Sequence, residues 1–184
     1  MVWRATGLCW SSAMEDLLLV VEAFLDAEGI AHQRDDTGDL TFDLPYGRTS
    51  YGCEVGQVGR TLTFAALWSG RIPSEKGGTA GTLLKRLSNT ASISGDTFLN
   101  PHRGQLKYFS SVDLSLSDLT VERVGTIIET LLDPFNVKIL AMKMVLDGQL
   151  SADAAVDCYA EWDRKRLAAL MHPFSGNAGD SSMN

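Results

Sequence analysis

The chain has 184 residues, of which 45% are hydrophobic and 21% are charged. This composition is typical of one folded domain with a sizeable core, and it excludes a wholly disordered chain. The formal net charge of -7 gives no long-range attraction to nucleic acid or anionic lipid, although it leaves room for a local basic patch. We expect no nucleic-acid partner, and a polypeptide partner with basic segments would suit this charge.

Three cysteines lie far apart and share no short spacing with a histidine: Cys9, Cys53 and Cys158. This odd, sparse set argues against a disulfide framework and favours a reducing compartment. The N-terminal apolar run is interrupted by Glu15, Asp16 and Glu22, so it lacks the clean core of a signal peptide and the roughly 18 to 20 apolar residues that span a bilayer. We expect a soluble, cytoplasmic protein without membrane insertion. Whether its start is Met1 or Met14 stays open.

The first predicted element is a helix from about residue 12 to 28. Apolar residues repeat at spacings of three and four between Met14 and Leu25, which indicates one apolar face. Ser12 begins the sequence SAME, which has the spacing of a capping box, and Gly29 is placed to end the helix.

Three strands are predicted next. After a turn at residues 36–39, residues 40–44 alternate apolar and polar side chains, and two more candidate strands follow at 49–58 and 61–68. Connections this short cannot hold a parallel crossover, so the three strands should form an antiparallel meander.

In the middle of the chain we expect a loop at residues 69–78, a short helix at 79–88 and a strand at 92–99. After a turn at 100–104, a long alternating stretch predicts a strand with one buried face. The apolar side chains at its even-numbered positions should form that face: Leu106, Tyr108, Val112, Leu114 and Leu116. Phe109 and Ser110 break this alternation, which a bulge or a covered second face would explain.

Helices are predicted for the rest of the chain. Thr120 is placed to cap the first of them. The Asp-Pro pair at Pro134 predicts an interruption and a new helix, because proline favours the first helical position after an Asp cap. Gly148 should stop that helix, Ser151 should cap a further one to about Leu170, and the Gly/Ser/Asn-rich end is typical of a disordered tail.

These elements predict an α+β fold. An antiparallel sheet of about five strands is flanked by helices in the order helix, three strands, helix, two strands, helix, with an extra C-terminal helix. We expect an α+β domain at residues 1–150, a C-terminal helical extension at 151–172 and a flexible tail at 173–184.

No catalytic, cofactor-binding or metal site is predicted. The glycines within 77–81 lack the Lys-Ser/Thr pair of a phosphate loop, so a linker is the preferred interpretation. Three histidines share no metal-ligand spacing: His32, His102 and His172. The spacing of the acidic cluster at 35–43 does not provide the glycine and final glutamate of a calcium loop, so the cluster fits a solvated hairpin. Three glycines in the strand region suggest bulges or a hairpin turn: Gly52, Gly56 and Gly59.

Four aromatic side chains are the candidate partner-binding residues: Trp68, Phe109, Tyr159 and Trp162. Core packing is the favoured interpretation for the tyrosine and the two tryptophans, and an apolar interface is the alternative. Phe109 lies on the second face of its predicted strand, together with Lys107. A short cationic run at 164–166 suits a helix end and is a further candidate for a partner patch.

The order of the elements resembles the YbjN-like family, which shares its fold with the class I type III secretion chaperones. The segments that carry the resemblance are MEDLLLVVEAFLDAEGI at 14–30, DDTGDLTFDL at 35–44, TLTFAAL at 61–67, and GQLKYFSSVDLS at 104–115 leading to LTVERV. The resemblance covers about residues 12–146. It implies a compact α+β domain that often forms a homodimer, binds another polypeptide through apolar surface and has no catalytic residues to carry over.

We therefore expect a non-enzymatic, protein-binding, chaperone-like or regulatory module. The alternative is a small-molecule-sensing regulatory domain with a pocket between the sheet and the helices. An enzyme is a third class, and a cluster of buried, hydrogen-bonded polar side chains in a cleft would support it.

Overall fold

The computed structural model describes residues 16–47, 49–91 and 95–171. Its helices are α1 Leu17–Ala27, α2 Gly77–Thr90, α3 Val121–Leu146 and α4 Ala152–Met171, with a 3-10 turn, η1, at Ser74–Lys76. Its strands are β1 His32–Arg34, β2 Leu40–Tyr46, β3 Thr49–Val58, β4 Thr61–Trp68, β5 Asp96–Asn100 and β6 Gln105–Asp113.

All described strands join one antiparallel sheet in the order β1-β2-β3-β4-β6-β5. The predicted α+β class and the meander of β2, β3 and β4 are confirmed. The sheet has six strands rather than about five, because His32–Arg34 pairs with residues 40–42 of β2. These three polar residues have no alternation of their own, so their strand depends on the partner strand.

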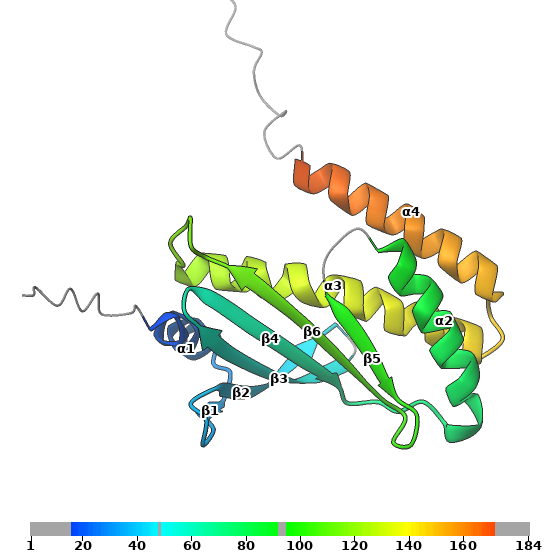
Figure 1. Cartoon of the computed structure of the whole chain (residues 1–184), viewed down its shortest axis with the longest axis horizontal. Coiled ribbons are helices and arrows are strands. Elements are labelled where there is room, and N and C mark those ends of the chain that lie inside the picture. Colours follow the sequence, from blue (N-terminus) through cyan, green and yellow to red (C-terminus); the bar gives the residue numbers. More distant parts are fainter. Residues whose placement is uncertain (1–15, 48, 92–94, 172–184) are drawn as a thin grey trace, which may run out of the picture.

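The described helices lie on one face of this sheet (Figure 1). In that view α1 and α3 lie behind the sheet, while α2 and α4 lie beyond the β5 edge and pack on the far half of α3. The face turned toward the viewer is covered by none of the described helices. The molecule is therefore asymmetric, with a core behind the sheet and an open surface in front.

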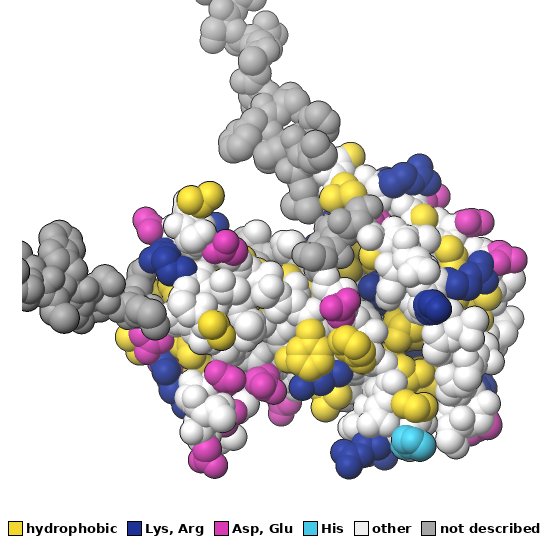
Figure 2. All heavy atoms as spheres, in the orientation of Figure 1, with side chains coloured by type: hydrophobic (Ala, Val, Ile, Leu, Met, Phe, Trp, Pro, Cys, Tyr) yellow, Lys and Arg dark blue, Asp and Glu magenta, His cyan; other side chains and the backbone are white. Residues whose placement is uncertain are grey.

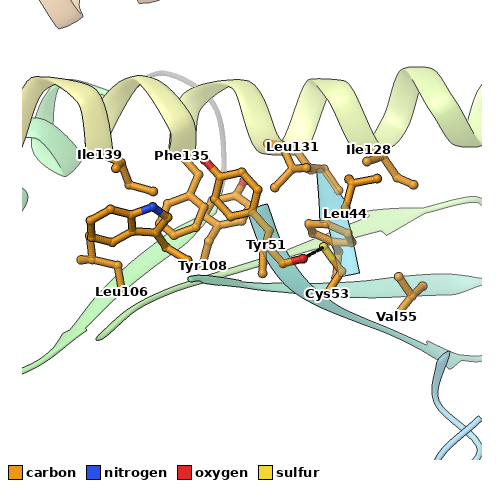
Figure 3. Packing of buried hydrophobic residues seen from close by; sticks show 14 of the residues in the cluster. Leu44, Tyr51, Cys53, Val55, Leu106, Tyr108, Ile128, Leu131, Phe135 and Ile139 are labelled. Carbon is orange, nitrogen blue, oxygen red and sulfur yellow. Dashed lines mark hydrogen bonds between the residues drawn. The ribbon is translucent and has the colours of Figure 1, made fainter. Parts of the chain in front are cut away.

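The core is built around aromatic side chains between the sheet and α3 (Figure 3). The Phe135 ring of α3 lies 5.4 Å from the Tyr108 ring of β6, centroid to centroid, and 5.5 Å from the Tyr51 ring of β3. Leu131 and Ile139 of the same helix extend this contact in both directions. Burial of these groups is the main stabilising term, because each aromatic ring removes a large apolar area from water.

Alternation in β6 matches the predicted buried face. Leu106 and Tyr108 point into the core, and Lys107 and Phe109 point to the open side. Pairing with β4 runs without interruption from Lys107 to Asp113, so the break at Phe109 and Ser110 is not a bulge. The prediction for Leu116 is wrong: the strand ends at Asp113, whose carboxylate accepts from the Ser115 N–H at 2.8 Å, and Leu116 is almost fully exposed.

Two helices begin at positions that differ from the prediction. α1 starts at Leu17, because Asp16 is extended and its carboxylate accepts from the Leu18 N–H at 3.1 Å; the predicted SAME capping box lies outside the described residues. α2 starts at Gly77, so the glycines interpreted as a linker form its first turn. Buried leucines on α2 and the Lys76 ammonium, which donates to the Leu146 carbonyl at 2.6 Å, hold that turn in place.

The predicted interruption at Pro134 is also wrong, since α3 continues through it to Leu146. A proline inside a helix has no N–H to donate and leaves the carbonyl four residues earlier without its helical partner. Here that carbonyl belongs to Thr130, and the Arg166 guanidinium of α4 donates to it. A side chain from the last helix thus replaces the hydrogen bond that the proline removes.

The remaining caps follow the prediction. The Thr120 hydroxyl accepts from the Arg123 N–H, and the Ser151 hydroxyl accepts from the Ala154 N–H at 3.1 Å. Gly148 has φ 72° just beyond α3. Ala155 and Tyr159 of α4 are buried in the same core cluster as the sheet, so the last helix completes the core of its own chain.

We predict that Arg166→Leu lowers the free energy of unfolding by about 1 to 3 kcal/mol, because it leaves the Thr130 carbonyl without a donor. Pro134→Ala should recover much of this loss, since the alanine N–H can donate to that carbonyl. Urea unfolding of both single variants and the double variant measures the coupling. The control is Arg164→Leu, an exposed neighbour; strictly additive effects of the two substitutions would contradict the assignment.

Candidate protein-binding face

The open face of the sheet presents the outward side chains of its strands. Antiparallel pairing places Glu54, Ala65, Phe109 and Asp96 in one row across β3, β4, β6 and β5. The next row contains Gly52, Leu67, Lys107 and Phe98. Cross-strand neighbours on one face lie about 4.5 to 5.5 Å apart at their Cβ atoms, so each row is a set of touching groups.

Two phenylalanines form an exposed aromatic pair on this face. Phe98 is 55% exposed and Phe109 is 41% exposed, and their ring centroids are 5.9 Å apart in an edge-to-face arrangement. The Lys107 ammonium lies 4.4 Å from the Phe109 centroid and 3.9 Å from a Glu54 carboxylate oxygen. Figure 2 shows hydrophobic side chains gathered over β5 and β6 near the middle of this face.

Beside the aromatic pair the face is hollowed. A depression of about 450 Å³ is lined by Gly56, Thr63, Ala65 and Phe109, among others. A second, of about 360 Å³, lies over β1, β2 and β3 around Gly52. The prediction of a hairpin turn is confirmed at Gly59, which has φ 62°, but Gly52 and Gly56 lie in regular pairing rather than bulges. Their missing side chains open the floor of the two depressions.

Among the charged outward positions of the described strands, acidic side chains predominate. Asp43, Glu54, Asp96 and Asp113 share the open face by register. Asp39 joins them, because its carboxylate lies 2.7 Å from where a Cβ on Gly56 would stand. Lys107 is the one cation at these strand positions.

The four predicted partner-binding aromatics are not brought together in one site. Trp68 is buried on the helix-covered face, where its indole N–H donates to the Thr49 hydroxyl at 3.0 Å. Tyr159 of α4 is buried, and the ring of the half-buried Trp162 on the same helix lies 5.7 Å from the tyrosine ring. Burial leaves Trp68 and Tyr159 little surface for a partner, and only Phe109 lies on the open face. The sequence analysis missed Phe98, which the outward parity of its short strand would have indicated.

The sequence analysis also missed a buried ionic cluster beneath α4. Lys138 of α3 is 2% exposed and Asp163 of α4 is 1% exposed. The Lys138 ammonium lies 3.4 Å from the Thr97 hydroxyl and 3.5 Å from the Ser88 hydroxyl. Burial lowers the pKa of Lys138, while the nearby carboxylates of Asp163 and Asp96 act in the opposite direction.

This cluster joins α4 to the core. Within the described residues the buried Tyr159 hydroxyl has no hydrogen-bond partner, and burial raises its pKa. A cluster of this kind would support an enzyme if it lined a cleft. Lys138 and Asp163 are instead almost completely enclosed, so a substrate cannot reach them, and the arrangement favours a structural role.

Other classes of site have little support in the described part of the chain. Residues 16–47, 49–91 and 95–171 contain no group of three or more His, Cys, Asp or Glu side chains arranged for a metal ion. No helix in these ranges is long and apolar enough to span a bilayer. Between the sheet and α3 the cavity lined by Val55, Phe64 and Ile128 measures about 20 Å³, which is room for about one water rather than a ligand. Two larger, open depressions lie at the margins of this layer, one of about 530 Å³ around Tyr46 and Gly125 and one of about 590 Å³ around Trp68 and Asn136.

The fold and its open face define a class: small α+β proteins with an antiparallel sheet covered by helices on one side only. Within that class the chain has a YbjN-like fold. It is similar to the crystal structure of YbjN, a candidate transcription regulator from E. coli, with TM-score 0.50 and 13% identity over 71% of this chain and 93% of that one.

A second similar structure is that of an uncharacterized protein from Methanothermobacter thermautotrophicus, with TM-score 0.48 and 10% identity over 69% of this chain and 96% of that one. No protein-family model and no curated protein matches the sequence. The likeness to the E. coli YbjN structure confirms, as a likeness of fold, the YbjN-like fold expected from the order of the elements.

We predict that the free energy of unfolding of the wild-type protein, measured relative to that of Lys138→Met, rises with pH in the range just below the ordinary lysine pKa of about 10.4. The lowered pKa of Lys138 means that the unfolded chain binds more protons than the folded chain in this window, so raising the pH favours the fold. Burial raises the pKa of the Cys53 thiol to about 12, which acts in the opposite direction but in both proteins equally. Urea unfolding across the pH range measures the difference. Lys143→Met, which removes an exposed amine of α3, is the control and should follow the wild type.

Proposed function

We propose that the protein is a non-enzymatic module that binds another polypeptide on the open face of its sheet. The observation that carries this proposal is the exposed pair of Phe98 and Phe109 on a face that none of the described helices covers. An antiparallel sheet with one solvated face normally presents polar side chains there. Covering the exposed part of both rings would contribute about 2 kcal/mol, and aromatic anchors of this kind are typical of interface hot spots.

The charge of the face supports a polypeptide over nucleic acid. Outward carboxylates such as Asp43 and Glu54 would repel phosphates. If the YbjN-like fold here serves regulation, as the description of the E. coli protein suggests for that protein, the regulation would act through a bound protein. The proposal includes a chaperone-like or regulatory role in the cytoplasm. The small-molecule sensor is the alternative, and the depressions of about 530 and 590 Å³ between strand ends and α3 are where its ligand would bind.

We predict that replacing both phenylalanines, Phe98→Ser with Phe109→Ser, abolishes selection of peptides by the protein. The measurement is a random-peptide display selection on the immobilised full chain, wild type and variant in parallel, followed by direct affinity measurement on the enriched peptides. The fold should be retained, since both side chains are largely exposed and the unfolding free energy should change by about 0.5 kcal/mol or less.

The matched control is Leu116→Ser with Leu140→Ser, which removes exposed apolar side chains that lie away from the open face. This variant should select the same peptides as the wild type. A selection that survives the loss of both phenylalanines, or that the control abolishes equally, contradicts the proposed binding face.

We further predict a homodimer, as the resemblance to the YbjN-like family implies. Sedimentation velocity should give twice the mass of the chain, and the substitutions of Phe98 and Phe109 should leave that mass unchanged. The physical reason is that two copies meeting through their open faces would bring like carboxylates together. A strict monomer contradicts the dimer, and a dimer that these substitutions dissociate would make the open face a self-interface.

A further inference from the structure

The open face contains two neighbouring depressions, one beside Phe109 and one beside Asp43, which we call together the trough. Gly52 and Gly56 of β3 and Ala65 of β4 form the low parts of its floor, and Glu54 projects between the two glycines. Its two walls are unlike. Phe109 and Phe98 stand on one side, over β6 and β5. The carboxylates of Asp39 and Asp43 stand on the other side, next to the two glycines.

The width of this trough matches one helix. From β2 to β6 there are three strand spacings, which amount to about 14 Å. An α-helix with its side chains is about 10 to 12 Å wide. An added peptide strand would instead use backbone groups at a sheet edge, so the occupant of a face is a segment that presents side chains. The ten residues of β3 extend about 33 Å, which is the length of a helix of about 20 residues.

The two walls also specify the charge pattern of that helix. A stripe of apolar side chains would cover the phenylalanine pair. Lys or Arg side chains on the flank of the helix would reach Asp39 and Asp43, and Glu54 lies between the walls. Because Lys107 already lies near both Glu54 and Phe109, the aromatic side of the trough has its own cation and the β2 side has none among its described strand positions.

Neither a second copy nor a segment of this chain suits these requirements. A second copy carries the same open-face carboxylates and a net charge of -7. Residues 1–15 contain a single cationic side chain, Arg4, and residues 172–184 contain neither Lys nor Arg. The charge complementarity therefore indicates a different polypeptide.

We infer that the partner segment is a cationic amphipathic helix, which lies in the trough over β3 and β4 with its apolar stripe on Phe98 and Phe109 and its cations toward Asp39 and Asp43. This inference rests on the proposed binding of a polypeptide to the open face. It adds the conformation and the charge of the segment that is bound.

The test uses the full chain and two synthetic 20-residue peptides. Both have leucines at helical spacings of three and four; one carries lysines at the remaining positions and the other carries glutamates. Fluorescence anisotropy should detect binding of the lysine peptide, with an affinity that falls as salt is raised, and circular dichroism should show that it becomes helical when bound. The glutamate peptide should not bind.

Three variants locate the contact. Asp39→Asn with Asp43→Asn should lower the affinity for the lysine peptide about fivefold. Gly52→Val should also lower this affinity, because its side chain fills the trough; an added Cβ there meets only the Asp43 carboxylate, at 3.7 Å. The matched control, Asp26→Asn with Asp157→Asn, removes the same charge from exposed positions on α1 and α4 and should leave the affinity within about twofold.

The outcomes separate this inference from the proposed function. Binding of the glutamate peptide, or equal loss in the control and in the Asp39 and Asp43 variant, overturns the cationic helix. Display selections that depend on Phe98 and Phe109 but enrich acidic or non-helical peptides also overturn it, and they leave the proposed function standing. Selections that do not depend on the phenylalanines overturn both.

Discussion

The arrangement of the molecule depends on one hydrogen bond between its last two helices. Pro134 removes the donor that the Thr130 carbonyl needs, and the Arg166 guanidinium supplies one from α4. Because α3 continues past its proline, its 26 residues run along the sheet and carry Leu131, Phe135 and Ile139 onto it. The same contact holds α4 against α3, where the buried Lys138 and Asp163 lie between them.

The described helices α1 and α3 pack on one face of the sheet, and the other face presents only the outward side chains of the strands. The helix-covered face is apolar at nearly every inward position, and its packing leaves no room for a ligand beside Val55 and Phe64. The open face combines glycines, carboxylates and one aromatic pair. The core thus lies on one side of the sheet and the proposed binding face on the other, so changes to the open face should have little effect on the fold.

Elements with local signals were predictable, and those with distant partners were not. Thr120, Ser151 and Gly148 mark helix ends through hydrogen bonds or φ values within a few residues, so the sequence located them. Strand β1 has three polar residues and exists only because β2 pairs with it. Of the candidate aromatics, Phe109 was placed on the second face by its parity, but Phe98 becomes its neighbour only through the register of β5 with β6.

By itself the sequence determined the α+β class, the antiparallel meander, most helix ends and the acidic character of the chain, because these follow from spacing, turn residues and composition. The tertiary structure decided whether α3 is broken at Pro134, where the buried charge of Lys138 is compensated, and which aromatic residues remain exposed. Each of these depends on groups that lie far apart in the chain and meet only when the core forms. Local periodicity carries no record of such contacts, since a proline, a lysine or a phenylalanine has the same local preferences whichever distant residue it faces.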